Sequence, residues 1–169
     1  MSVVRKLYNM NQLMLFFTSI IVTATLTITS PAFKNNGSIP DKYTCDGTNT
    51  NPELNISGVP ENAKSLALIV DDPDAPSGTF VHWVMWNIPV SSKIEENSVG
   101  GMQGKNGKNE NKYTGPCPPR GTHHYHFKMY ALDSMLDLSL NTDKEALLKA
   151  MEGHVLAMGE LVGEYNRKK

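Results

Sequence analysis

Two strand-like runs joined by one short turn constrain the fold of this chain more than any other feature. Residues 65–70 read SLALIV, and residues 79–88 read TFVHWVMWNI. The first run is apolar after its leading Ser, which is typical of a strand buried on both faces. The second is rich in the aromatic and β-branched residues that favour strands. The intervening DDPDAPSG contains Pro and Asp residues, which form turns, so the segment predicts strand, turn and strand.

The rest of the chain indicates a mostly antiparallel β fold in one domain. A length of 169 residues fits a single domain, and 13 Gly and 10 Pro indicate many turns. Further strands are expected at 25–29 and 124–132, with at most short strands within 31–60 and a long loop over 100–121. Helical patterns do not separate the strands, so a parallel α/β fold is not expected.

One helix is predicted near the C-terminus. Residues 142–145 (TDKE) form a capping box, the helix EALLKAM spans 145–151, and Gly153 ends it. Residues 154–165 fit either a closing strand or a second helix, and two glycines within this stretch favour the strand.

Composition and motifs exclude several classes of function. The chain is 40% hydrophobic and 20% charged, with a formal net charge of −1. The sequence has no excess of basic residues that would indicate nucleic-acid binding, and no acidic tract that would indicate disorder. The signatures GxSxG, HExxH, GxGxxG and Walker A do not occur. Candidate chemistry must therefore come from residues that the fold brings together.

Residues 1–24 are expected to be a secretory signal peptide. Two basic residues precede an apolar run over 13–22, and the small residue Ala24 marks a cleavage site. The run is shorter than the roughly 20 apolar residues of a membrane span. Cleavage would leave a domain of residues 25–169 in the periplasm or outside the cell. The alternatives are an uncleaved anchor or a start at Met10.

Export would allow a disulfide bond, since exported proteins can keep one. Cys45 and Cys117 are the only two cysteines, and both lie in turn-like sequence. They are either bridged or two free, buried thiols. A nucleophilic role for Cys117 is disfavoured, because prolines flank it and oxidation would compete.

Three histidines lie close together in GPCPPRGTHHYHF, residues 115–127. Side chains alternate across a strand, so His123 and Tyr125 share the face that continues into the core, and His124 and His126 share the wetter face. A His-x-His pair can chelate a transition metal, but no third ligand stands at a suitable spacing. No metal site is therefore expected.

The inward-facing histidines predict a small concave site. The same alternation places one set of side chains on a single face of the 79–88 strand: Phe80, His82, Val84 and Trp86. Asp72 in the preceding turn could orient His82, and both could meet His123 and Tyr125 beside the PPRG turn. Imidazoles, a phenol and turn N–H groups suit phosphate or another oxyanion. The structural alternative is that these polar groups only satisfy one another.

Two long motifs resemble the paired signatures of the phosphatidylethanolamine-binding protein family, also called Raf kinase inhibitor-like proteins. They are DDPDAPSGTFVHWVMWNIP at 71–89 and GPCPPRGTHHYHFKMYALD at 115–133. Segments 30–54 and 153–165 resemble the bacterial branch as well. The resemblance implies a β-sandwich of two antiparallel sheets with Greek-key connections and a few short peripheral helices. It also implies a small surface pocket for phosphate-like anions and phosphoethanolamine headgroups.

The resemblance implies which residues line the pocket: Asp72, His82, Pro119, His123 and Tyr125, with Phe80 at the position of an aromatic wall. Cys45 and Cys117 match cysteines common in bacterial members, which favours the disulfide bond. Kinase regulation is not expected of an exported chain.

The sequence therefore predicts an exported binding protein that is not an enzyme and needs no cofactor. Its expected partner is a small phosphorylated ligand or lipid headgroup, with peripheral membrane contact and a monomeric or homodimeric state. Anion affinity is expected to rise as the pH falls towards about 6.5, where imidazoles gain a proton. The alternative is a protease or other enzyme inhibitor that acts through a surface loop.

Overall fold

The centre of the fold is the strand β4 (Ser65–Asp72), in which every residue is buried. The computed structural model describes residues 25–91 and 93–167, so the predicted signal peptide lies outside the described residues. β4 pairs on one side with β5 (Phe80–Ile88) and on the other with β8 (Thr122–Leu132), both antiparallel. The strand–turn–strand prediction and the burial of β4 on both faces are confirmed.

The larger sheet has six strands in the order β2-β9-β8-β4-β5-β7. Its remaining members are β2 (Gly37–Ser38), β7 (Met102–Gln103) and β9 (Val155–Asn166). β4, β5 and β7 are adjacent in the sheet, and β8, which follows them in the chain, lies on the other side of β4. This is the Greek-key order. The predicted mainly β fold, with two sheets and one short helix, is confirmed. One short edge pair departs from the antiparallel pattern, because the two-residue strand β2 runs parallel to β9.

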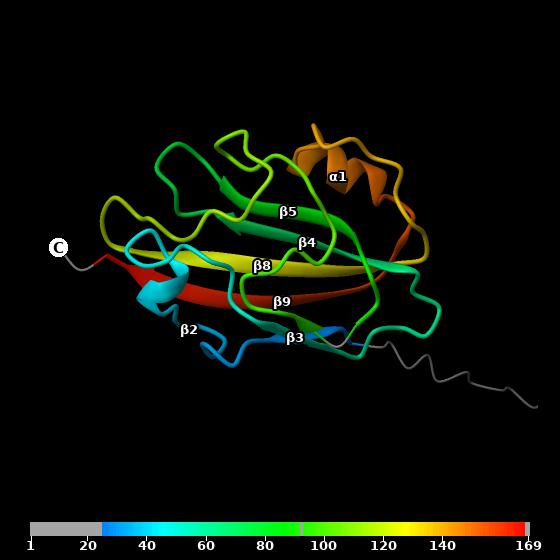
Figure 1. The fold of residues 1–169 in the computed structure, drawn as a ribbon, viewed down its shortest axis with the longest axis horizontal. Coiled ribbons are helices and arrows are strands. Elements are labelled where there is room, and N and C mark those ends of the chain that lie inside the picture. The colour runs from blue at the N-terminus through cyan, green and yellow to red at the C-terminus, as the bar shows by residue number, and fades with distance from the viewer. Residues whose placement is uncertain (1–24, 92, 168–169) are drawn as a thin grey trace, which may run out of the picture.

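A three-stranded sheet packs on one face of the larger sheet and a helix on the other (Figure 1). The small sheet contains β1 (Thr27–Thr29), β3 (Leu54–Ser57) and β6 (Lys93–Ile94). Its apolar side chains share a core with the inner faces of β4, β8 and β9. The helix α1 (Lys144–Ala150) covers a second apolar cluster on β4 and β5. A single 3-10 turn, η1 (Asp41–Tyr43), is the other helical element in the described residues.

The start of α1 differs by one residue from the predicted capping box. Asp143, and not Thr142, is the N-cap, and its side chain accepts a hydrogen bond from the N–H of Ala146 at 2.9 Å. Thr142 is buried instead. Both residue types can cap a helix, so the sequence alone does not choose between adjacent candidates.

The C-terminal segment forms a strand, as its glycines favoured. Gly159 of β9 faces the backbone of the N-terminal segment, and a Cβ atom there would lie 2.3 Å from the carbonyl oxygen of Leu26. Only glycine allows this approach, by which the residues leading into β1 cross the inner face of β9.

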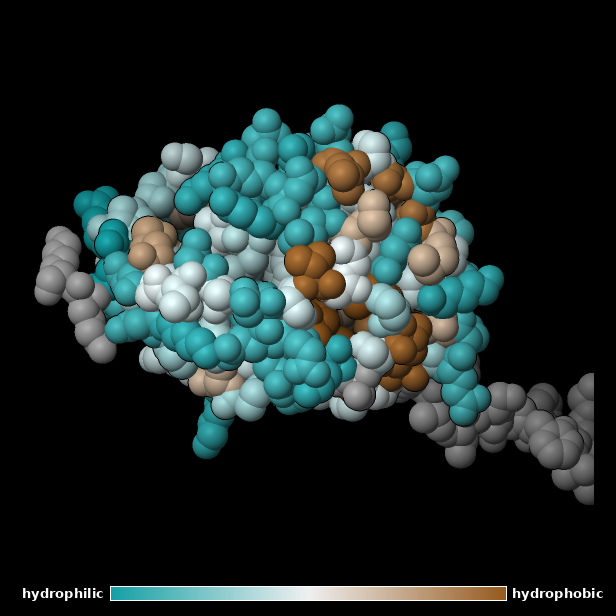
Figure 2. Space-filling model, in the orientation of Figure 1, coloured by the Kyte–Doolittle hydropathy of each residue, from teal (hydrophilic) through white to brown (hydrophobic). Residues whose placement is uncertain are grey.

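The surface of the described residues is mixed in character. In Figure 2, hydrophilic and neutral groups cover most of the left half of the visible face. The strongly hydrophobic groups gather in the centre and the right half. No helix in residues 25–91 and 93–167 has the length and apolar character needed to cross a membrane.

A disulfide bond joins Cys45 to Cys117, across 72 positions of sequence. Their Cα atoms are 5.4 Å apart, within the usual range for a bridged pair. The backbone N–H of Cys45 also donates to the carbonyl of Pro116 at 3.0 Å. The bond therefore ties the loop after η1 to the segment that leads into β8.

Replacing both cysteines by Ala should lower the free energy of unfolding. Opening a loop of this length costs up to about 4 kcal/mol in the chain-entropy model. Urea denaturation of the oxidised wild type, the reduced wild type and the Cys45→Ala/Cys117→Ala variant would measure the loss. The reduced protein and the variant should agree, and an unchanged midpoint in both would show that the bond adds no stability.

Candidate functional site

A pocket of about 660 Å³ opens at one end of the larger sheet. Its walls come from the turn after β4, the start of β5, the loop between β7 and β8, and the first turn of α1. The volume is typical of small-molecule sites. Five of the predicted residues line it: Asp72, Phe80, His82, Pro119 and His123. Their role as ligand contacts stays a prediction.

A buried hydrogen bond between Asp72 and His123 joins β4 to β8 at the back of the pocket. Nδ1 of His123 lies 2.7 Å from Oδ2 of Asp72, and both side chains are at most 7% exposed. The other carboxylate oxygen accepts the N–H of Asp74 at 2.8 Å. Because the carboxylate accepts from Nδ1–H, the unshared Nε2 of His123 is left to face the pocket. The sequence indicated that Asp72 could orient His82, whereas in the structure its hydrogen bond is to His123.

His82 enters the pocket through a β-bulge in β5. Val70 pairs with Trp83 and Asp71 pairs with Val81, so His82 is the extra residue between them. The prediction that Val84 and Trp86 share a face with His82 is therefore wrong, because both pack under α1. The bulge turns the His82 ring away from α1, towards Phe80 and Tyr125.

The hydrogen bonds of His82 determine which nitrogen can meet a ligand. Its Nδ1–H donates to the carbonyl of Thr114 at 2.5 Å, and the ring packs edge-on against Phe80 and Tyr125. Burial lowers its pKa, partly offset by the bond to Thr114, with nearby Lys108 lowering it further. His82 is therefore neutral near pH 7, with Nε2 as an acceptor. It can donate to an anion only after it gains a second proton.

Tyr125 lies beneath the pocket and does not line it. Its ring is 1% exposed and packs between the imidazoles of His82 and His123, with centroids 5.1 and 6.5 Å away. Burial and the charge of Asp72 raise the pKa of its phenol, so it stays protonated. The backbone of Cys117 lies near its hydroxyl and offsets part of this rise. Tyr125 therefore supports the two imidazoles from below the pocket.

Each outer histidine of β8 pairs with a carboxylate. His124 bonds to Asp74, and His126 bonds to Glu160, through Nδ1 at 2.7 and 2.9 Å. No group of three or more ligating side chains suited to a metal occurs in the part of the chain that the structure describes. Asp74 also accepts the backbone N–H of His124, so this pair anchors the turn after β4 to the start of β8.

Two charged residues that the sequence did not single out also line the pocket. They are Lys108, in the loop between β7 and β8, and Glu145, in the first turn of α1. A turn-rich stretch such as KNGKNENK gives no sign of which lysine faces a site. The sequence pattern explained Glu145 as part of the predicted capping box, so it gave no sign that this residue also lines the pocket.

Comparison with known proteins identifies the family. Residues 29–166 match the model of the phosphatidylethanolamine-binding protein family. The chain belongs to this family.

Solved structures of family members share the fold. A phosphatidylethanolamine-binding protein homolog of Chlamydia trachomatis superposes with a TM-score of 0.83 at 41% identity, covering 86% of this chain and 99% of that one. YbcL of Escherichia coli superposes with a TM-score of 0.79 at 30% identity, covering 86% and 100%. A UPF0098 protein of Pyrococcus abyssi is 52% identical over 150 residues, covering 82% of this chain and 84% of its own length.

The imidazoles of His82 and His124 should titrate on opposite sides of the ordinary value of 6.5. Burial holds the pKa of His82 below it, and the hydrogen bond to Asp74 holds that of His124 above it. NMR titration of the imidazole protons would measure both in one sample. A midpoint for His82 at or above that of His124 would contradict the hydrogen-bond assignment.

Proposed function

We propose that this protein binds a small phosphorylated ligand, free or as a lipid headgroup, in the pocket around His123. The observation that carries this is the buried Asp72–His123 pair. It leaves the His123 Nε2 without a hydrogen bond to any described residue. Membership of a family named for phosphatidylethanolamine binding, and a solved relative described as a homolog of it, support the same class of ligand.

The pair suits an anion because Asp72 holds Nδ1–H of His123 and leaves Nε2 to face the pocket. A protonated imidazole would donate Nε2–H to a phosphate oxygen, while Asp72 holds Nδ1–H on the far side. Nε2 of neutral His82 would accept a hydrogen bond from the P–OH group of a phosphate monoester, which is present below about pH 6. A headgroup phosphodiester has no P–OH group, so only His123 would contact its phosphate by a charge-assisted hydrogen bond.

We propose binding and not catalysis. Among the described residues, neither pocket imidazole hydrogen-bonds a hydroxyl or thiol that it could activate, and Cys117 is held in the disulfide. We further propose that the protein acts outside the cytosol, as a monomer or homodimer without a cofactor, in peripheral contact with membranes that display such headgroups. An exposed disulfide persists in such a compartment.

Replacing His123 by Ala should weaken binding of phosphoethanolamine by about tenfold or more, the value of one charge-assisted hydrogen bond. Isothermal titration calorimetry at pH 6.5 would measure this. His154→Ala is the matched control, because His154 is an exposed imidazole paired with Asp133. In the wild type, the NMR signals of His82 and His123 should shift with the ligand while that of His154 stays fixed. Equal affinities in both variants would contradict the proposed site.

A further inference from the structure

Lys108 and Glu145 bring opposite charges to the pocket from two different elements. Neither makes an ion pair with any residue that the structure describes. By contrast, their neighbours in sequence, Lys112 and Lys144, pair with Glu110 and Asp71 at 3.3 and 2.6 Å. The two unpaired charges are therefore free to meet a ligand.

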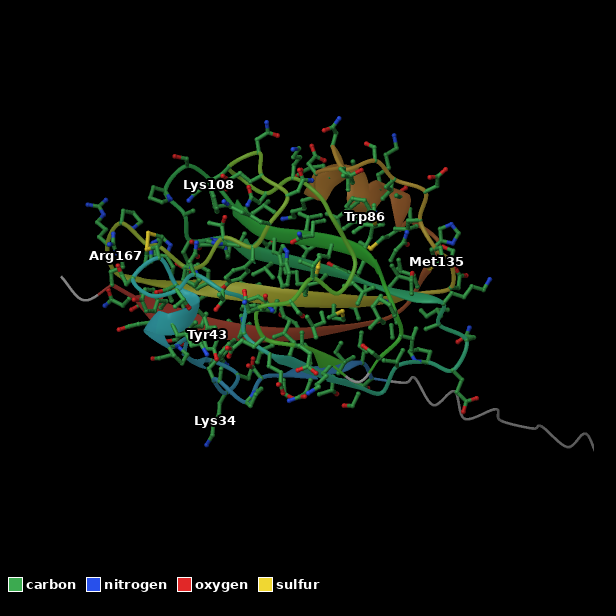
Figure 3. The ribbon with its side chains drawn as sticks, viewed as in Figure 1. Lys34, Tyr43, Trp86, Lys108, Met135 and Arg167 are labelled. Atoms are coloured by element: carbon green, nitrogen blue, oxygen red, sulfur yellow. A yellow bond between two sulfur atoms is a disulfide. The ribbon has the colours of Figure 1, made fainter. Side chains whose placement is uncertain are left out.

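The backbone that carries Lys108 is held in place. Buried Asn106 accepts hydrogen bonds through Oδ1 from the N–H groups of Lys108 and Glu110, at 2.9 and 3.0 Å. The next residue, Gly107, lies so close to Phe80 that a Cβ atom would be 2.6 Å from the ring. A larger residue at this position would displace the ring, so glycine lets the loop lie directly against the aromatic wall of the pocket. The charge of Lys108 reaches His82, whose pKa it helps to lower. Figure 3 shows Lys108 and Met135 in opposite halves of the molecule.

The backbone that carries Glu145 is fixed by its neighbours. Asp143 caps the helix, and Lys144 forms an ion pair with Asp71, which is 1% exposed. Asp71 directly precedes Asp72 in β4, so this ion pair ties the first turn of α1 to the strand end that enters the pocket. The backbone at Glu145 is therefore anchored beside the pocket that this residue lines.

The charges around the pocket fit neither a plain anion nor a plain cation. Lys108 is the single Lys or Arg among the described residues that line it. Asp72 is committed to His123, and His82 is uncharged near pH 7. A phosphate would gain the positive charge of Lys108 but meet the negative charge of Glu145. A molecule that carries both a phosphate and an ammonium group would match both.

We propose, on the basis of the proposed function, that Lys108 and Glu145 select zwitterionic ligands. Lys108 pairs with the phosphate, and Glu145 pairs with an ammonium group on the same molecule. The two residues are specificity determinants on the rim, while His82 and His123 hold the phosphate deeper in the pocket.

Calorimetric titration of the purified full chain with inorganic phosphate and with phosphoethanolamine separates the two roles. Lys108→Met should weaken both ligands about five- to tenfold, since both present the anion, and Lys108→Arg should retain most of the affinity. Glu145→Gln should weaken phosphoethanolamine about fivefold and leave phosphate unchanged or tighter, because a repulsive charge is removed.

Matched controls are Lys112→Met, in the same loop but paired with Glu110, and Glu152→Gln, exposed just after α1. Neither residue lines the pocket, so neither change should alter the affinity for either ligand. Thermal melts would verify that each variant folds.

The outcomes distinguish this inference from the proposed function. A wild type that binds neither ligand overturns both. A wild type that binds both, with Glu145→Gln altering their affinities in equal proportion or not at all, overturns only the selection of zwitterions. Loss of affinity in Lys112→Met equal to that in Lys108→Met would show a general effect of net charge and would likewise overturn the assignment to Lys108.

Discussion

The burial of β4 on both faces is the constraint on which the rest of the structure depends. Its side chains alternate between two apolar clusters, with Leu66, Leu68 and Val70 on one side and Ala67 and Ile69 on the other. A strand of this kind needs a covering layer on each face. The three-stranded sheet covers the first cluster and α1 covers the second, so the architecture follows from one strand that cannot face water.

The same alternation continues into two adjacent carboxylates at the end of β4. Asp71 faces α1, and Asp72 faces the pocket. Burial opposes ionisation of Asp71, but its hydrogen bonds to Lys128 and Lys144 outweigh this and lower its pKa. Asp72 instead holds His123 in the orientation that leaves Nε2 for a ligand. Asp71 therefore anchors the helix, while Asp72 orients His123 at the site. Both residues lie at the same end of β4.

Much of the site could be predicted from the sequence because it follows strand parity. On β8, the alternation that sent His123 and Tyr125 inward and His124 and His126 outward is what the structure shows. On β5, the same reasoning failed beyond His82, because a bulge adds one residue and reverses the faces that follow. A bulge depends on how two strands pair, and the sequence of one strand does not specify it.

The sequence by itself determined the long strands, the turns, the single predicted helix and the inward histidines, since these depend on local periodicity and turn chemistry. It did not indicate the two-residue strands β6 and β7, which form only by pairing with β3 and β5. Only the tertiary structure decided which groups meet, Asp72 with His123 and His82 with the Thr114 carbonyl, and that Lys108 and Glu145 line the same pocket. These partners lie on elements far apart in the chain. Their positions depend on strand order, on the bulge in β5 and on the loop held by buried Asn106. These features depend on how distant segments pair, so no local sequence pattern predicts them.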